Sequence, residues 1–110
     1  MEKRKMVYIC SPFSGDVEGN TVKARRYSRY AVDLGAVPIA PHLLLPQYME
    51  EETERDLAIQ FDLEILKRCD ELWVFGAEQR LSAGMETELD AARGLGMAIR
   101  FFTVDMKEDS

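Results

Sequence analysis

Short apolar runs alternate with amphipathic segments along the whole chain. Four runs have the length and composition of strands that are buried on both faces of a parallel sheet, at residues 6–10, 36–40, 71–76 and 97–104. Apolar residues at helical spacing lie between these runs. They predict one helix from Asn20 or Thr21 to residue 34, a second over residues 53–68 and a third over residues 82–93. Gly35 and Gly94 are expected to end the first and third helices.

This alternation predicts the fold class. Neighbouring parallel strands need a crossover connection, which is usually a helix, so the order of elements indicates a doubly wound α/β fold of the flavodoxin-like or Rossmann-like kind. We expect a parallel sheet of four or five strands with helices on both faces, forming a single domain over residues 1–110. Segment 43–53 has no clear pattern and is expected to cover the site as a loop or a short helical turn.

Composition and charge narrow the classes of function. The 110 residues are 46% apolar and 31% charged, with a formal net charge of −6. These values are typical of a compact protein that binds neither nucleic acid nor membrane broadly. No apolar stretch approaches the roughly 18 residues of a membrane span, and the start has too short an apolar run for a signal peptide, so we expect a cytoplasmic protein. Cys10 and Cys69 lack metal-ligand spacing, which favours buried free thiols and predicts no structural zinc.

Two carboxylates interrupt apolar helix faces. Residues three and four positions away share a helix face, and for Glu88 and Asp62 these neighbours are all small or apolar. Glu86 and Asp90 have polar neighbours and are expected to be solvated. A carboxylate on an apolar face is costly to desolvate unless a partner or a ligand uses it. We therefore expect either a structural acid with a backbone or arginine partner, or a functional pair in one cleft.

The loops after the strands are the expected place for a ligand. In doubly wound folds ligands bind beyond the carboxyl ends of the strands, so segments 11–20, 41–47 and 76–84 should converge. Ser82 is predicted to cap the third helix, and together with the first amides of that helix it could bind an anion. Tyr8 is either a core aromatic or a site residue, and His42 is either a loop hydrogen-bonder or a substrate contact. Neither a Walker motif nor GxGxxG is present.

Three segments carry a family resemblance. They are VYICSPF at residues 7–13, DLEILKRCDELWVF at residues 62–75 and SAGMETELDAA at residues 82–92. Their order and joint spacing resemble the nucleoside 2-deoxyribosyltransferase superfamily, which includes the 2'-deoxynucleoside 5'-monophosphate N-glycosidases. Segment 41–49, PHLLLPQYM, is most similar to short bacterial and phage relatives whose activity is not established.

The resemblance implies roles for individual residues. A glutamate four residues after a glycine is the nucleophile of that superfamily, and Glu88 and Gly84 fill these places. Asp62, eight residues before Asp70, would position the sugar and the nucleophile, and Tyr8 matches the tyrosine of the first strand. Substrate contacts are expected from Ser11, Phe13, His42, Ser82, Gly84 and Met85, with Ser82 at a 5'-phosphate.

The resemblance also implies a function. We expect an enzyme that cleaves or transfers the N-glycosidic bond of a 2'-deoxynucleoside or its 5'-monophosphate, without a cofactor, as a homodimer or larger homo-oligomer. The expected partner is a small nucleoside or nucleotide rather than nucleic acid or a membrane. One alternative is a non-catalytic nucleotide sensor of the same fold. Another is an interaction protein that uses the acidic segment EEETERD at residues 50–56.

Overall fold

The computed structural model describes residues 3–109, apart from the side chain of Glu51. Within this range the chain forms a sheet of five strands, which are β1 (Met6–Cys10), β2 (Val37–Ile39), β3 (Glu71–Phe75), β4 (Ala98–Phe102) and β5 (Glu108–Asp109). Their order across the sheet is β2-β1-β3-β4-β5. The first four strands are parallel, and β5 runs antiparallel to β4. The predicted α/β fold with a parallel sheet is therefore confirmed for the first four strands, and the antiparallel β5 is an addition to it.

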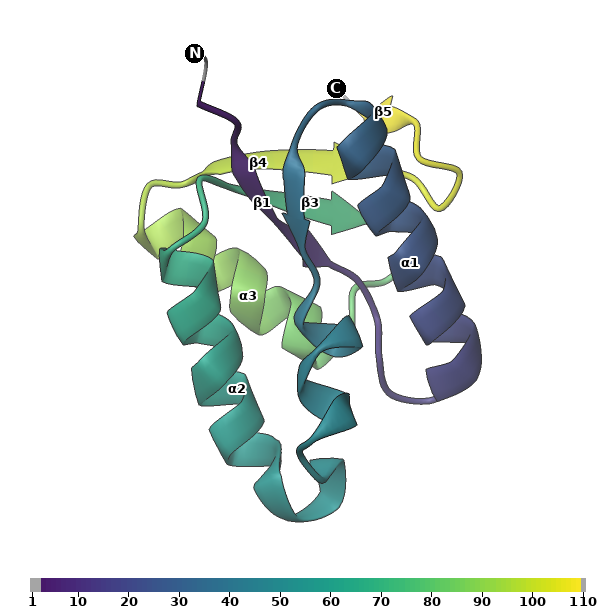
Figure 1. Cartoon of the computed structure of the whole chain (residues 1–110), viewed down its shortest axis with the longest axis vertical. Coiled ribbons are helices and arrows are strands. Elements are labelled where there is room, and N and C mark those ends of the chain that lie inside the picture. Colours follow the sequence, from purple (N-terminus) through teal and green to yellow (C-terminus); the bar gives the residue numbers. More distant parts are fainter. Residues whose placement is uncertain (1–2, 110) are drawn as a thin grey trace.

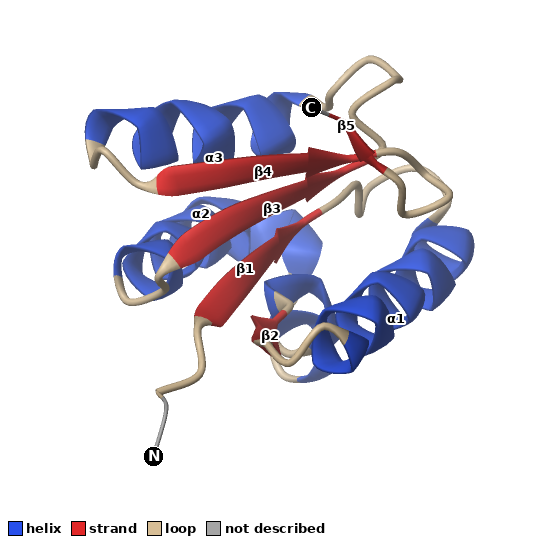
Figure 2. Cartoon of the chain, turned by 90° about the horizontal axis from the view of Figure 1, so that it is seen from above, coloured by secondary structure: helices blue, strands red, loops and turns tan. Residues whose placement is uncertain are grey.

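Helices cover both faces of the sheet. These are α1 (Val17–Asp33), α2 (Glu51–Lys67) and α3 (Ala83–Gly94). Figure 1 shows α2 and α3 side by side, and Figure 2 shows α1 across the sheet from them. Two short 3₁₀ helices, η1 (Pro41–Leu43) and η2 (Leu45–Gln47), precede α2, where the sequence predicted a loop or short turn. No helix in the described range is long and apolar enough to cross a membrane.

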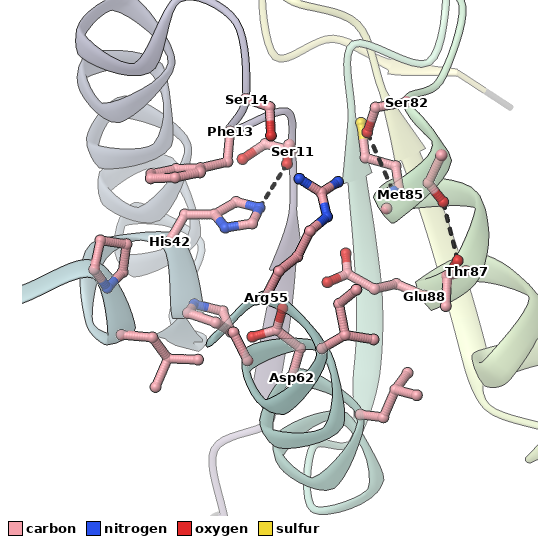
Figure 3. Close-up of a pocket in the computed structure, with 18 of the residues that line it drawn as sticks. Ser11, Phe13, Ser14, His42, Arg55, Asp62, Ser82, Met85, Thr87 and Glu88 are labelled. Atoms are coloured by element: carbon pink, nitrogen blue, oxygen red, sulfur yellow. Dashed lines mark hydrogen bonds between the residues drawn. The ribbon is translucent and has the colours of Figure 1, made fainter. Parts of the chain in front are cut away.

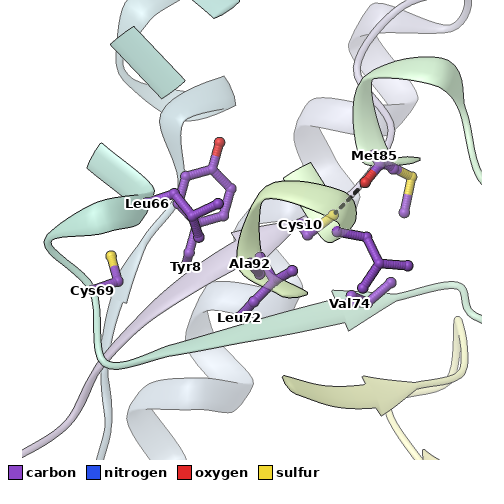
Figure 4. Close-up of a cluster of buried hydrophobic side chains, with 9 residues drawn as sticks. Tyr8, Cys10, Leu66, Cys69, Leu72, Val74, Met85 and Ala92 are labelled. Atoms are coloured by element: carbon purple, nitrogen blue, oxygen red, sulfur yellow. Dashed lines mark hydrogen bonds between the residues drawn. The ribbon is translucent and has the colours of Figure 1, made fainter. Parts of the chain in front are cut away.

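Side-chain alternation along β1 determines which residues reach the site. Successive strand residues point to opposite faces, so Tyr8 and Cys10 face α2 and α3 while Val7 and Ile9 face α1. The core on the Tyr8 face includes Leu66 of α2 and Met85 of α3 (Figure 4). Tyr8 therefore enters the space between the sheet and the two helices that carry Asp62 and Glu88.

The core under α1 is mainly aromatic. Tyr27 of α1 stacks on Phe75 with ring centroids 4.3 Å apart, and Phe75 stacks on Phe102 at 4.8 Å. Stacked rings add to the free energy gained from burial alone. This layer fixes β3 and β4 from behind and leaves the opposite face of the sheet to form the site. Cys10 and Cys69 are free and buried, as predicted.

The ends of all three helices differ from the prediction, and α2 begins at Glu51 rather than at residue 53. Helix α1 begins at Val17, before the predicted start at Asn20 or Thr21, because the Asp16 side chain caps it by accepting the amide of Gly19 at 3.1 Å. Asn20 instead uses its side-chain amide to bind the Phe13 carbonyl at 3.1 Å. Gly94 is the last residue of α3 and Leu95 is its C-cap, so the helix ends one residue later than predicted.

Gly96, two residues after the end of α3, has a left-handed φ of 67°. Gly35 takes the same role after α1, with a φ of 85°. Strand β5 was not among the predicted runs, since it has two acidic residues and no apolar pattern. A bidentate ion pair from Arg100 to Glu108, at 2.6 and 2.7 Å, holds β5 against β4.

Candidate active site

A cavity of about 340 Å³ opens where the carboxyl ends of the parallel strands meet α2 and α3. This volume falls within the range of pockets that hold small molecules. Every substrate-binding residue expected from the sequence lines it, namely Ser11, Phe13, His42, Ser82, Gly84 and Met85, together with Asp62 and Glu88. Tyr8 does not line the cavity, but its hydroxyl bonds Glu88, which does. Figure 3 shows Asp62 on α2 and Glu88 on α3 facing the same space.

Glu88 is held by Tyr8. The Tyr8 hydroxyl donates a 2.5 Å hydrogen bond to Glu88 Oε2, and the Glu88 side chain is buried. Burial raises the pKa of Glu88 to about 7, and the bond from Tyr8 opposes that rise. Burial and the charge of Glu88 hold the pKa of Tyr8 well above its usual value, so Tyr8 remains a hydroxyl donor. Glu88 is thus a fixed carboxyl group that ionises near neutral pH.

Asp62 contributes a second perturbed acid. Burial raises its pKa to about 6, and its Oδ1 atom is buried without a hydrogen-bond partner among residues 3–109. A purely structural role for Asp62 would require a backbone or arginine partner. Its Oδ1 atom has no such hydrogen-bond partner in this part of the chain. The charge of Asp62 also contributes to the raised pKa of Glu88, which means that the two carboxyl groups interact. Acids with raised pKa values in one cavity are typical of catalytic sites.

The start of α3 forms one end of the cavity. Ser82 caps the helix, with Oγ accepting the Met85 amide at 3.2 Å, as predicted. The first amides of a helix have no partner within the helix, so they favour an anion. At Gly84, an added Cβ would meet no atom within 4 Å. Ser11 is also buried at this cavity, and its Oγ has no hydrogen-bond partner among the described residues.

An aromatic pair forms another wall of the cavity. Phe13 stacks on His42 with ring centroids 5.0 Å apart and an interplanar angle of 25°. His42 Nε2 donates to the Ser11 carbonyl at 2.9 Å, which fixes the orientation and the tautomer of the ring. Apolar side chains of Leu45, Ile59 and Leu63 continue this wall. The combination suits a flat, partly polar ring such as a nucleobase.

The sequence did not single out Arg55. Its side chain extends from α2 into the cavity in Figure 3. It lies in the acidic segment 50–56, which the sequence suggested only as the partner-binding surface of the alternative interaction protein. Arg55 nevertheless precedes Asp62 by seven positions, which is about two helical turns and places both residues on one face. That spacing was the available signal. Ser14, Glu50 and Thr87 are further lining residues that were not expected.

Comparisons with known proteins agree with the fold. A family model described as "Domain of unknown function (DUF7768)" matches residues 5–102. No curated protein matches the chain. Among solved structures, the 2-deoxyribosyltransferase of the psychrotolerant bacterium Bacillus psychrosaccharolyticus has a TM-score of 0.73 at 23% identity, over 89% of this chain and 72% of that enzyme.

The 2-desoxiribosyltransferase of Leishmania mexicana has a TM-score of 0.65 at 17% identity, over 90% of this chain. This chain covers 64% of the Leishmania protein, which is less than two thirds of its length. At these identities the similarities establish a shared fold. They confirm the fold that the sequence resemblance implied.

Proposed function

We propose the following function for this chain, which belongs to the family described as Domain of unknown function (DUF7768): it cleaves or transfers the N-glycosidic bond of a 2'-deoxynucleoside or its 5'-monophosphate. The observation that carries the proposal is the buried Glu88, bound by Tyr8 and facing Asp62 across a cavity of nucleoside size. The names of the two structural neighbours support the class of substrate.

In the proposed mechanism Glu88 is the nucleophile. Its carboxylate oxygen forms a bond to the anomeric carbon of the sugar while the bond from that carbon to the base nitrogen breaks. The electron pair of the broken bond leaves with the base, which takes a proton from solvent or from a nearby acid. Water then hydrolyses the glycosyl ester and releases the sugar, or the nitrogen of a second base displaces Glu88 and regenerates a nucleoside.

The neighbouring groups have supporting roles in this mechanism. Tyr8 holds one oxygen of Glu88, so the other oxygen is directed to the substrate. Asp62 orients Glu88 or a sugar hydroxyl, and its unpaired Oδ1 supports a role toward the ligand. The base lies against Phe13 and His42, and the 5' end of the sugar lies toward Ser82 and Gly84. Apart from Tyr8, these groups line the cavity, and they come from the loop after β1, from η1, from α2 and from α3.

Release of free base tests the proposal. Purified protein is incubated with each 2'-deoxynucleoside and each 5'-monophosphate, and the base is detected by chromatography. Glu88→Gln keeps the size and hydrogen bonding of the side chain but removes the nucleophilic charge, so it should abolish release. The control is Glu86→Gln on the exposed side of α3, which should leave the rate nearly unchanged. Equal rates for wild type and Glu88→Gln would make Glu88 a structural acid.

The raised pKa of Glu88 also favours a second candidate function. At about 7, this pKa leaves much of Glu88 protonated at neutral pH, and a neutral acid can bond a ligand without attacking it. Such a protein would bind a nucleotide as a sensor and leave it intact. Saturable nucleotide binding without release of base, across pH 6 to about 9, would favour the sensor over the enzyme.

A further inference from the structure

We infer that Arg55 determines specificity by binding a phosphate group of the substrate. The inference rests on the proposed function and narrows it to 2'-deoxynucleoside 5'-monophosphates in preference to free nucleosides. Among the described residues, Arg55 is the only lysine or arginine that lines the cavity. Its guanidinium extends from α2 toward the side of the cavity formed by Ser11 and the start of α3 (Figure 3).

The acidic side chains around the cavity oppose the binding of an anionic ligand, and a nearby cation would reduce this repulsion. Glu50, Asp62 and Glu88 line the same space, and any of them that is ionised repels a phosphate. A guanidinium offers two parallel N–H donors to phosphate oxygens and stays charged at every relevant pH. Arg55 therefore offsets the acidic wall at the position where its side chain reaches the cavity.

Independent donors face Arg55 from the other elements. Ser11 is 1% exposed, and its Oγ is buried without a hydrogen-bond partner in the described range, so a hydroxyl donor is available at the end of β1. The amides of Ala83 and Gly84 lie in the first turn of α3, where no helical carbonyl accepts them. A phosphate between Arg55 and these groups would be bound from three segments of the chain.

The position of these donors suits the proposed chemistry. Gly84 and Glu88 are one helical turn apart, which is about 6 Å along the axis of α3. A sugar ring can bridge this distance, with its 5' substituent at Gly84 and its anomeric carbon at Glu88. Free space at Gly84 lets a ligand approach the backbone closely. A phosphate on the 5' carbon therefore falls on the side of the cavity toward which Arg55 points.

Arg55→Gln tests the inference, because glutamine keeps a polar side chain but removes the charge. The matched control is Arg68→Gln near the end of the same helix, where Arg68 pairs with Glu64 away from the cavity. The kcat/KM is measured for a 2'-deoxynucleoside 5'-monophosphate and for the matching nucleoside. We expect wild type to favour the monophosphate. Arg55→Gln should lower kcat/KM roughly ten- to a hundredfold for the monophosphate and less than about twofold for the nucleoside.

Calorimetric binding to Glu88→Gln protein, with and without Arg55→Gln, separates this inference from the proposed function. One outcome is that the protein binds the monophosphate preferentially, that Arg55→Gln removes this preference, and that wild type releases no base. This outcome would overturn the proposed chemistry and keep the role of Arg55. Equal losses for both substrates, or no preference in wild type, would overturn the role of Arg55 and keep the chemistry. No binding of either compound would overturn both. Circular dichroism confirms that each variant is folded.

Discussion

The Tyr8 hydroxyl donates a 2.5 Å hydrogen bond to Glu88 Oε2 across 80 positions of sequence. It joins a central strand of the sheet to the helix that carries the proposed nucleophile. Burial and, less strongly, the charge of Asp62 favour the neutral form of Glu88, whereas the bonds from Tyr8 and Cys10 favour the charged form. The pKa of about 7 is the balance of these effects. The ionisation of Glu88 therefore depends on a residue outside the wall of the cavity.

Tyr8→Phe removes the bond and leaves the burial. The pKa of Glu88 should then rise above about 7, because the larger of the two effects that lower it is lost. We expect the acid limb of the pH profile for base release to move to higher pH, with a rate at pH 7 that is roughly tenfold lower. Carbon NMR titration of the Glu88 carboxyl measures the pKa directly. Tyr27→Phe, on the opposite face of the sheet, is the control. An unmoved titration would show that Tyr8 does not control Glu88.

Stability should fall as pH rises from 5 to 8. The folded protein holds protons on Glu88 and Asp62 with pKa values of about 7 and about 6, above the ordinary 4.5 and 3.8. The stability that these protons contribute is fully present below the ordinary pKa values. It is lost as pH rises through the pKa values of the folded state. The loss for Glu88 is on the order of 3 kcal/mol, and the partly exposed Asp62 adds less.

Urea unfolding at several pH values measures this dependence. Glu88→Gln should flatten the profile, since glutamine does not titrate, while Glu86→Gln on the exposed side of α3 should keep the slope of wild type. A free energy of unfolding that is constant or increases between pH 5 and 8 would contradict the raised pKa values.

Gly84→Ala should separate binding from stability. A Cβ at Gly84 meets no protein atom within 4 Å, so folding should be unaffected or improved by up to about 1 kcal/mol through the higher helix propensity of alanine. The same methyl group enters the space where a nucleotide would contact the backbone, and affinity should drop at least about tenfold. Gly94→Ala, with equal space at the far end of α3, provides the control. Similar affinities for both variants would place the ligand elsewhere.

Ser11→Ala removes a buried hydroxyl that has no hydrogen-bond partner in the described range. Because an unsatisfied polar group costs about 1–3 kcal/mol, the substitution should leave the ligand-free protein as stable as wild type or slightly more stable. Nucleotide affinity should fall, since the hydroxyl is available to a ligand. Ser28→Ala is the contrasting control, because Ser28 Oγ already donates to the Ala24 carbonyl at 2.8 Å. Lower melting temperature for Ser11→Ala than for Ser28→Ala would refute this interpretation.

Local sequence patterns predicted the features that depend on residues close together in the sequence. Four parallel strands followed from apolar runs, and the unusual settings of Glu88 and Asp62 followed from their helical neighbours. The meeting of these acids in one cavity required the packing of α2 beside α3, which the order of elements made plausible. A family resemblance supplied the assignment of Glu88 over Glu86 as nucleophile, and that assignment stays a prediction.

Other features depended on contacts that the local pattern does not encode. Strand β5 consists of Glu108 and Asp109 and is held by an ion pair to Arg100, so no apolar periodicity marks it. The start of α1 was placed too late because Gly19 disfavours a helix interior, whereas the cap from Asp16 offsets that cost. Arg55 belongs to a charged segment that resembles a solvated face until the fold places it at the cavity.

The strand order has a consequence for how the protein folds during its synthesis on the ribosome. Of the five strands in the sheet, β1 is synthesised first, yet it lies between β2 and β3. Its backbone pairs with residues 37–39 on one side and residues 71–74 on the other, so it keeps an open edge until β3 has left the ribosome. The contact from Tyr8 to Glu88 forms later still, with α3. During synthesis or refolding, nucleotide binding should therefore appear only after the central strand has gained both of its neighbours.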